Sequence, residues 1–185
     1  MNELLLYTAQ APVVLETLER DGVSRVKREY IRKKYGDVAW VFFTAYAFFR
    51  ENARSIVPCP PECESAVWLF RDPRWCYAAP GSLLMRFRIP ADQVILFDQR
   101  LWNRILSLEY IGRDAADEQR FEQELKSLGL ANTQMIFSSA FYPLQKRKIL
   151  ESWKRLFTET DFPDEQAEAA VWELRREWLE DVKQV

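Results

Sequence analysis

The sequence contains no histidine, and this absence excludes several mechanisms at once. Without an imidazole, the chain cannot form a Ser-His-Asp or Cys-His nucleophile pair, and it cannot hold zinc through histidine. A general base would have to be a carboxylate, a lysine, a tyrosine or a cysteine with a shifted pKa. Any catalysis by this chain must therefore use one of those groups.

Cysteine and glycine are also scarce, with three and five residues respectively. Cys59 and Cys63 have a loose metal-ligand spacing, but a structural zinc site needs four ligands, and Cys76 alone does not complete it. We therefore expect three reduced thiols and no metal site. The five glycines are scattered, so no phosphate-cradling loop is visible.

Neither sign of charge dominates, and no apolar run is long. The 26 Lys and Arg residues balance 28 Asp and Glu residues, which excludes the bulk positive field of a general nucleic-acid binder but not a local patch. The longest apolar run, residues 38–49, is shorter than the ~18 residues of a membrane span. The N-terminus lacks the basic region of a signal peptide. These absences predict a cytoplasmic protein with no membrane segment.

Aromatic and aliphatic residues are plentiful, and they predict a well-packed core. Hydrophobic residues make up 48% of the chain and aromatic residues 14%, including seven tryptophans. A chain of 185 residues is long enough to bury a substantial core in one unit. We expect a single domain that spans residues 1–185.

Hydrophobic periodicity predicts interspersed strands and helices. Strands are expected at residues 4–6, 66–70, 83–89, 94–97 and 134–137, and helices at residues 13–20, 38–52, 100–110, 115–128 and 144–157. The helix at residues 38–52 is apolar nearly all round, which is typical of a central, buried helix. Because βαβ alternations are few, we predict an α+β fold with one small mixed or antiparallel sheet packed against several helices.

Residues 165–180 are compatible with two structures. Val171, Leu174 and Trp178 recur at helical spacing, which favours one helix that begins near residue 164. Residues 169–174 are also compatible with a strand, followed by a turn and a short final helix. The pattern alone leaves both alternatives open.

Residues 24–34 form a strongly basic segment. The spacing favours a solvated helix face, because helices routinely carry such faces, over a site that binds phosphates. The basic residues of this patch are Arg25, Lys27, Arg28, Arg32, Lys33 and Lys34.

Several sequence blocks occur in the order typical of a bacterial family of uncharacterised domains. They read LLLYTAQ, LETLERDGV, AVWLF, LLMRFRIPADQVILFDQRLWNRIL, SWKRLF and AVWEL. The chain thereby resembles that family, whose members open with an LYTIQ-like strand, carry a VPDxVLLSD-like hairpin and close with SWxxF and a QAxxWxL-like strand. The resemblance covers nearly the whole chain and carries no function with it.

The first strand and helix also resemble those of small ADP-ribosyltransferases. In those enzymes a polar residue on the first strand holds the ribose of NAD, and the catalytic glutamate begins a late strand in a QAE-like context. Residues 166–168 read QAE here, while residues 7–9 read YTA where an arginine or histidine is usual. The resemblance implies NAD as a substrate, with Tyr7, Thr8 and Gln10 binding NAD and Glu168 as the catalytic residue.

This chemistry is compatible with the composition. Cleavage of the nicotinamide glycosidic bond builds positive charge on the ribose, which a carboxylate stabilises without a metal or a histidine. The hypothesis predicts one cleft that contains Gln10 and Glu168, with nicotinamide stacked on Tyr7, Trp68 or Tyr77. If residues 165–180 are helical, Glu168 is instead an ordinary solvated residue.

The alternative function is a non-catalytic interaction domain. Aromatic residues in the loop at residues 71–81 and the basic segment would then bind a protein or a nucleic acid, because tryptophan, tyrosine and arginine commonly anchor interfaces. Hydrolysis by paired carboxylates in residues 114–118 or 161–168 is the least favoured reading, because such acidic runs usually cover helix starts.

Overall fold

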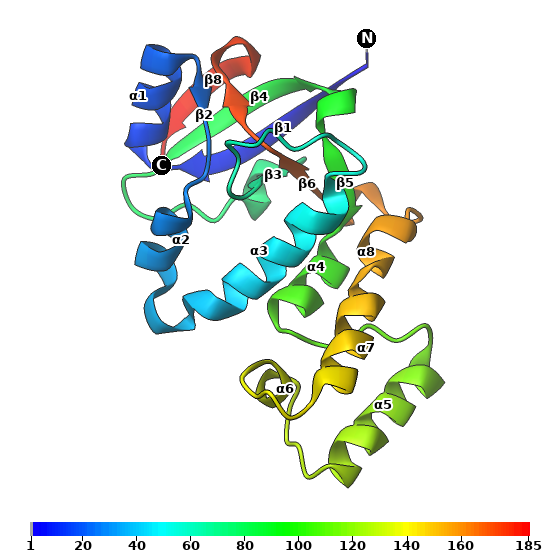
Figure 1. Ribbon diagram of the computed structural model, residues 1–185. Helices are drawn as coiled ribbons and strands as arrows, with labels where there is room; N and C mark the ends of the chain where they lie inside the picture. Colours follow the sequence, from blue (N-terminus) through cyan, green and yellow to red (C-terminus); the bar gives the residue numbers. More distant parts are fainter. Residues whose placement is uncertain (1) are drawn as a thin grey trace.

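The computed structural model describes residues 2–185, which form an α+β fold (Figure 1). Its strands are β1 (Glu3–Gln10), β2 (Val23–Ser24), β3 (Val67–Phe70), β4 (Leu83–Pro90), β5 (Ile95–Asp98), β6 (Ala167–Val171), β7 (Leu174–Arg175) and β8 (Leu179–Gln184). Its α-helices are α1 (Pro12–Asp21), α2 (Arg28–Tyr35), α3 (Ala39–Ala53), α4 (Gln99–Leu106), α5 (Ala115–Ser127), α6 (Gln134–Phe137), α7 (Pro143–Trp153) and α8 (Arg155–Thr158).

Six strands form one antiparallel sheet in the order β5-β6-β3-β1-β4-β8, and β2 pairs with β7 in a separate two-stranded ribbon. The pairing of β1 with β4 is long and extends from Glu3–Pro90 to Gln10–Leu83. Figure 1 shows α3 crossing the middle of the molecule, while α5, α6 and α7 extend away from the sheet. The predicted α+β class and the sheet packed against helices are confirmed.

The sheet separates two hydrophobic cores. On one face, α1 contributes Leu18, which packs with strand residues such as Leu6 and Phe87. The other face carries a larger core, in which Phe49 of α3 lies at the centre of an aromatic cluster. Five aromatic rings have centroids 4.9–6.2 Å from the Phe49 ring, namely those of Trp68, Phe97, Trp102, Phe157 and Trp172.

Two of the buried tryptophans, Trp153 and Trp172, have hydrogen-bond partners for their indole N–H groups. Trp172 Nε1 donates a hydrogen bond to the Val57 carbonyl at 2.8 Å, and Trp153 Nε1 donates to the Glu109 carbonyl at 2.7 Å. A buried indole N–H without a partner would be destabilising, so these bonds fix how each ring enters the core. The aromatic cluster is therefore both apolar and directionally constrained.

The chemistry of nearby residues explains the two ends of α1 and the start of α4. Pro12 begins α1, and Gly22 ends it with φ 74°, a left-handed conformation that glycine adopts without a Cβ clash. Asp98 caps α4, where its carboxylate accepts a hydrogen bond from the Arg100 backbone N–H at 2.8 Å. Both ends follow from chemistry within one turn of chain.

Two predicted elements are wrong. Residues 134–137 form the short helix α6 instead of a strand. Residues 165–180 contain strands β6 and β7 and a short 3-10 turn before β8, so the single helix is wrong. The alternative strand at residues 169–174 and the turn after it are confirmed in part, but strand β8 stands where that alternative placed a short final helix. All five residues of β6 are buried because it lies between β3 and β5 with both faces covered, and such a strand does not alternate.

Three helix predictions need smaller corrections. The basic segment is helical only from Arg28 onward. The helix predicted at residues 100–110 ends at Leu106, and Leu108 follows with φ 58°. The helix predicted at residues 144–157 is divided into α7 and α8. Among the described residues, no helix has the length and apolar character needed to cross a membrane.

The aromatic cluster generates a stability prediction. Replacing Phe49 with alanine should lower the free energy of unfolding by about 3–5 kcal/mol, because the cavity left at the centre of the cluster cannot close. Urea denaturation followed by tryptophan fluorescence measures this loss. Phe141→Ala is the matched control: its ring is 88% exposed, and the change should stay within about 0.5 kcal/mol. Equal losses in the two variants would show that Phe49 is not central to the core.

Candidate functional site

A cleft of about 750 Å³ lies between the sheet, the ribbon strand β2 and helices α1–α4. This volume falls in the range of roughly 300–1,000 Å³ that is usual for small-molecule and cofactor sites. Its wall contains Thr8 and Gln10 of β1, Trp68 of β3 and Glu168 of β6. The sequence suggested Tyr7, Thr8, Gln10 and Glu168 as site residues. The structure brings the last three of them to one cavity.

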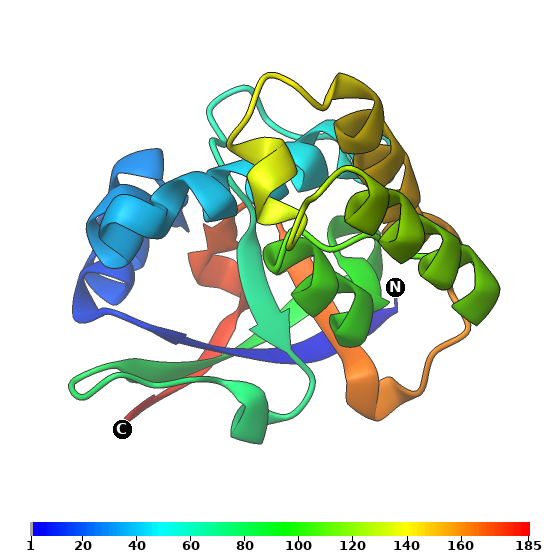
Figure 2. The ribbon, with the colours of Figure 1, turned by 90° about the horizontal axis from the view of Figure 1, so that it is seen from below.

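The cleft opens where the sheet splits. Strands β1 and β3 pair only at Tyr7 and Phe70, although both strands continue beyond that pair. Figure 2 shows β3 (teal) running across β1 (blue) instead of alongside it. The cleft is lined by consecutive residues of each strand, namely residues 8–10 of β1 and residues 66–68 of the β3 segment. The edges of the two strands therefore form walls of the cleft.

This split explains how Thr8 and Glu168 share a cavity. Tyr7, Phe70 and Glu168 lie in one row across β1, β3 and β6, and paired residues point to the same face of a sheet. Thr8 follows Tyr7 and so points to the opposite face. In a continuous sheet the two side chains would be separated, whereas the gap between β1 and β3 gives both of them access to the cleft.

Glu168 is a buried carboxyl group without a polar partner among residues 2–185. Its residue is only 5% exposed, and no side chain or backbone N–H in that part of the chain donates a hydrogen bond to it. Burial raises the pKa of Glu168 to about 8. Because a buried carboxylate is costly without compensation, this environment favours the neutral acid at neutral pH.

Aromatic rings form the inner wall beside Glu168. The centroid of the Tyr46 ring lies 5.1 Å from that of Trp68 and 6.0 Å from that of Trp102. All three side chains line the cleft. Burial raises the pKa of the Tyr46 phenol well above its ordinary value, and Tyr35 and the Glu168 carboxylate add to that shift. Tyr46 therefore stays protonated and provides a hydroxyl close to Glu168.

Thr8 and Gln10 form a polar pair on the opposite wall. Gln10 Nε2 donates a hydrogen bond to Thr8 Oγ1 at 2.8 Å, and Thr8 is only 3% exposed. The pair leaves the amide oxygen of Gln10 and the hydroxyl hydrogen of Thr8 for a ligand. Tyr7 does not line the cleft, and its pairing with Phe70 places it where the two halves of the sheet join.

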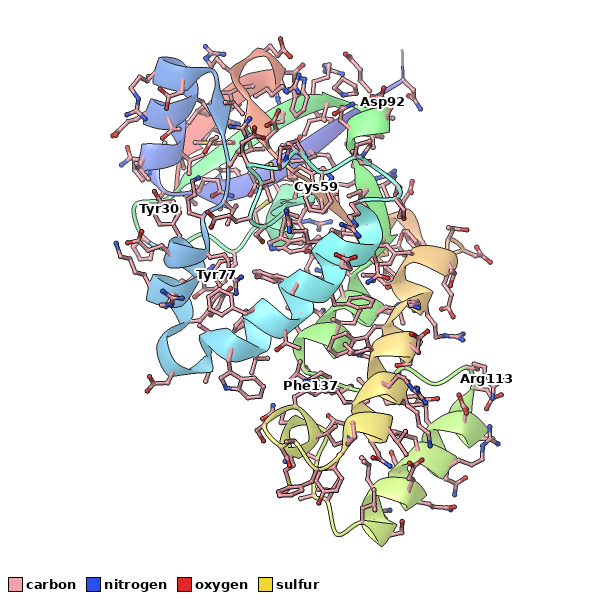
Figure 3. The ribbon with its side chains drawn as sticks, viewed as in Figure 1. Tyr30, Cys59, Tyr77, Asp92, Arg113 and Phe137 are labelled. Atoms are coloured by element: carbon pink, nitrogen blue, oxygen red, sulfur yellow. The ribbon has the colours of Figure 1, made fainter. Side chains whose placement is uncertain are left out.

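The mouth of the cleft is basic and aromatic. Lys27 and Lys34 from the start and end of the α2 segment line it, together with Tyr30 of α2. The loop at residues 71–82 contributes Trp75 and Tyr77, and Figure 3 shows Tyr30 and Tyr77 beside α2. This neighbourhood was not apparent from the sequence, because residues 24–34 and 71–82 are separated by the whole of α3.

The cysteines offer no nucleophile and no metal site in the described chain. Cys76 lines the cleft, but burial, together with the nearby Asp72 carboxylate, raises the pKa of its thiol to about 11. Burial likewise raises the pKa of Cys63 to about 11. All three cysteines are free, and no cluster of three or more metal-ligating side chains occurs within residues 2–185. Glu168 is thus the carboxyl group that the cleft presents for chemistry at its inner wall.

Two residues of the inner wall were missed by sequence reasoning. Tyr46 and Trp102 lie on helices that were predicted at residues 38–52 and 100–110 and that were given no part in the site. Their helical positions carry no signal that separates a core ring from a ring that lines a cavity. Only the crossing of α3 over the split sheet distinguishes the two roles.

Comparison with known proteins identifies a family. Residues 5–180 match the family model described as "Domain of unknown function (DUF3841)". No curated protein and no solved structure matches the chain. The family match confirms the resemblance read from the ordered sequence blocks, whereas the resemblance to ADP-ribosyltransferases has no counterpart among these comparisons.

The raised pKa of Glu168 predicts an unusual pH dependence of stability. An unfolded glutamate titrates near 4.5, so the folded state binds an extra proton between that pH and about 8. Because the folded state holds this proton more tightly, the proton stabilises it. That stabilisation is fully present below about pH 4.5 and is lost as the pH rises through 8. Glu168→Gln, which stays neutral, should match the natural protein at pH 4.5 and exceed it by on the order of a few kcal/mol at pH 8.5.

Urea denaturation at pH 4.5 and pH 8.5 measures this difference. Glu122→Gln on the exposed surface of α5 is the control and should change stability little at either pH. An equal effect of Glu168→Gln at both pH values would contradict the titration described above.

Proposed function

Since the chain belongs to the family described as a domain of unknown function (DUF3841), we propose from the site itself that the cleft binds NAD and that Glu168 promotes cleavage of its nicotinamide–ribose bond. ADP-ribose would then pass to an acceptor or to water. The observation that carries this proposal is a buried carboxyl group, without a hydrogen-bond donor among residues 2–185, on the wall of a large aromatic cleft.

A buried acid with a raised pKa suits a cationic substrate. The nicotinamide ring of NAD⁺ carries a positive charge, and an opposite charge nearby favours the ionised form of a carboxyl group. Binding of NAD⁺ would therefore lower the pKa of Glu168 and release a proton. The desolvation cost of the carboxylate, which nothing in the described chain offsets, would then be offset by the substrate.

The same carboxylate suits the reaction itself. As the bond between ribose C1 and the nicotinamide nitrogen breaks, its electron pair leaves with neutral nicotinamide, and positive charge develops on the ribose. An ionised Glu168 stabilises that charge in a site with a low dielectric. The acceptor then forms a bond to C1 and loses its proton, which Glu168 can accept.

Other residues of the cleft offer contacts to the nicotinamide ring and the ribose of NAD. Tyr46, Trp68 and Trp102 offer aromatic faces for the nicotinamide ring. The Thr8–Gln10 pair offers a hydroxyl donor and an amide acceptor, which match the paired hydroxyls of a ribose. Tyr7 has no ligand-contact role in this arrangement and instead supports the junction of the sheet.

The order of the elements supports the resemblance to small ADP-ribosyltransferases. Thr8 and Gln10 lie on the first strand, and Glu168 is the second residue of β6, a late strand. Those enzymes likewise place a ribose-binding polar residue on the first strand and a glutamate at the start of a late one. The Thr8–Gln10 pair would act in place of the arginine or histidine that is usual on the first strand.

The first test compares NAD⁺ with NADH by titration calorimetry between pH 6 and pH 9. The affinity for NAD⁺ should rise by up to about tenfold per pH unit below pH 8 and level off above it, because only ionised Glu168 attracts the cationic ring. The uncharged ring of NADH should show a much weaker dependence. Two other groups of the cleft, Tyr46 and Cys76, have raised pKa values and stay protonated in this pH range. Asp21 stays ionised, because the Arg20 side chain lowers its pKa. The pH dependence therefore reports on Glu168.

Glu168→Gln should abolish the pH dependence of NAD⁺ binding. Parallel pH profiles for NAD⁺ and NADH in the natural protein would instead show that Glu168 does not contact the nicotinamide.

The second test measures release of nicotinamide from NAD⁺. Glu168→Gln should lower the rate by about 100-fold or more, because the developing charge loses its counter-charge. Gln10→Ala should raise the Kd for NAD⁺ by roughly tenfold through loss of one polar contact. Gln184→Ala, on the exposed edge strand β8, is the control and should leave both values unchanged. Absence of any NAD binding at millimolar concentration would favour the non-catalytic interaction domain instead.

A further inference from the structure

We propose that the acceptor is a single-stranded nucleic acid, held on a rim that α2 and the loop at residues 71–82 form around the mouth of the cleft. Its role as an acceptor rests on the proposed NAD chemistry, whereas its binding does not. We call this surface the basic rim. It consists of five residues that line the cleft, Lys27, Tyr30, Lys34, Trp75 and Tyr77, and of Arg28 and Arg32, which lie on α2 but do not line the cleft.

The cations of the basic rim have no carboxylate partners among residues 2–185. Most arginines of the chain form ion pairs, and on α2 itself Lys33 pairs with Glu29 at 3.1 Å. No ion pair in that part of the chain involves Lys27, Arg28, Arg32 or Lys34, and all four residues are exposed. Four cations that form no ion pair therefore lie on one short helix and its start, in a chain whose net charge is −2. The nearby Glu64 carboxylate accepts a hydrogen bond from the Arg28 backbone N–H at 2.7 Å and does not pair with any of the four side chains.

Three of these cations contact an aromatic ring instead of an acid, and one of them is Lys34, whose Nζ lies 5.2 Å from the centroid of the Tyr35 ring. The guanidinium carbons of Arg28 and Arg32 lie 4.7 and 5.9 Å from the centroid of the Phe43 ring on α3. A cation–π contact orients a guanidinium and leaves its N–H donors free. Planar donors that are fixed and unoccupied are well suited to bind phosphate oxygens.

Exposed aromatic rings accompany the cations. Tyr77 is 91% exposed, Tyr30 55% and Trp75 53%, and all three line the mouth of the cleft. A large aromatic side chain contributes little to the stability of the fold when it is exposed. A cluster of exposed rings beside a cavity therefore indicates a binding surface. Phosphate-binding cations interleaved with stacking rings are the usual arrangement of proteins that bind single-stranded nucleic acid.

The chemistry of the rim favours a nucleic acid over an acidic peptide. An acidic peptide would be attracted by the four cations, but its acidic side chains carry no aromatic ring to stack on Tyr77, Tyr30 and Trp75. A duplex would satisfy the cations while keeping its bases stacked on one another and out of reach. A single strand uses both features of the surface at once.

The position of the rim also suits transfer. Lys27 and Lys34 line the same cleft as Glu168, so a strand bound to the rim would place a base or sugar nucleophile at the cleft mouth. A nitrogen or oxygen of that nucleotide would form the new bond to ribose C1 as neutral nicotinamide departs. Its displaced proton would pass to Glu168 or to water.

The binding test uses fluorescence anisotropy with labelled 12-nucleotide DNA and RNA strands of one sequence, in the absence of NAD. If four phosphates are neutralised, the affinity should fall by about 50-fold between 50 and 200 mM salt. A duplex of the same sequence and a poly-glutamate chain of equal charge should each bind at least tenfold more weakly. The DNA and RNA arms identify which strand is preferred.

Matched variants locate the surface. Arg28→Gln/Arg32→Gln should weaken binding at 50 mM salt by at least tenfold and make the salt dependence shallower by about 1.4 in the logarithmic slope. Lys126→Gln/Arg147→Gln is the control, because both residues are exposed, have no carboxylate partner within residues 2–185 and lie on α5 and α7. Tyr77→Ala should weaken binding about tenfold through lost stacking, whereas Phe141→Ala, a ring of equal exposure remote from the rim, should not.

The results separate this inference from the NAD proposal. No binding of either strand at 50 mM salt, equal binding of poly-glutamate, or equal loss in the rim and control variants would each overturn the nucleic-acid assignment, whatever calorimetry shows for NAD. If both ligands bind, incubation with labelled NAD should transfer label to the preferred strand and not to the duplex. Label that reaches only water would overturn the role of acceptor.

Discussion

Pairing between β1 and β3 is confined to Tyr7 and Phe70, and the form of the site depends on this constraint. Beyond that pair, each strand keeps its other neighbour: β1 stays paired with β4, and β3 with β6. The two halves of the sheet can therefore separate without leaving either strand unsupported. The gap between them gives side chains from opposite faces, Thr8 and Glu168, access to one cavity.

The aromatic cluster around Phe49 supports the inner wall of that cavity. Trp68 and Trp102 belong both to the cluster and to the cleft lining, so the packing that holds the core also fixes the surface that a ligand would meet. The same packing buries Glu168, and no group in the described part of the chain donates a hydrogen bond to its carboxyl group. A fold gains nothing in stability from a carboxyl group in such a place, which is characteristic of a functional site.

Part of the fold could be read from the chain because the relevant chemistry is local. The start of α1 at Pro12, the left-handed Gly22 and the cap at Asp98 each involve residues within a turn of one another. The alternation of Met85 and Phe87 with Arg86 likewise reports a strand with one buried face. β6 could not be read in this way, because both of its faces are covered and its apolar run has no period.

By itself the sequence determined the fold class, the family and the absence of histidine chemistry, and it singled out Thr8, Gln10 and Glu168 together with Tyr7. Only the tertiary structure decided that these three residues line one cleft, that Tyr7 does not, and that α2 and the loop at residues 71–82 meet at its mouth. Local propensities act over a few residues, whereas the split of the sheet depends on how strands distant in the chain pair. That pairing leaves no pattern in any one strand.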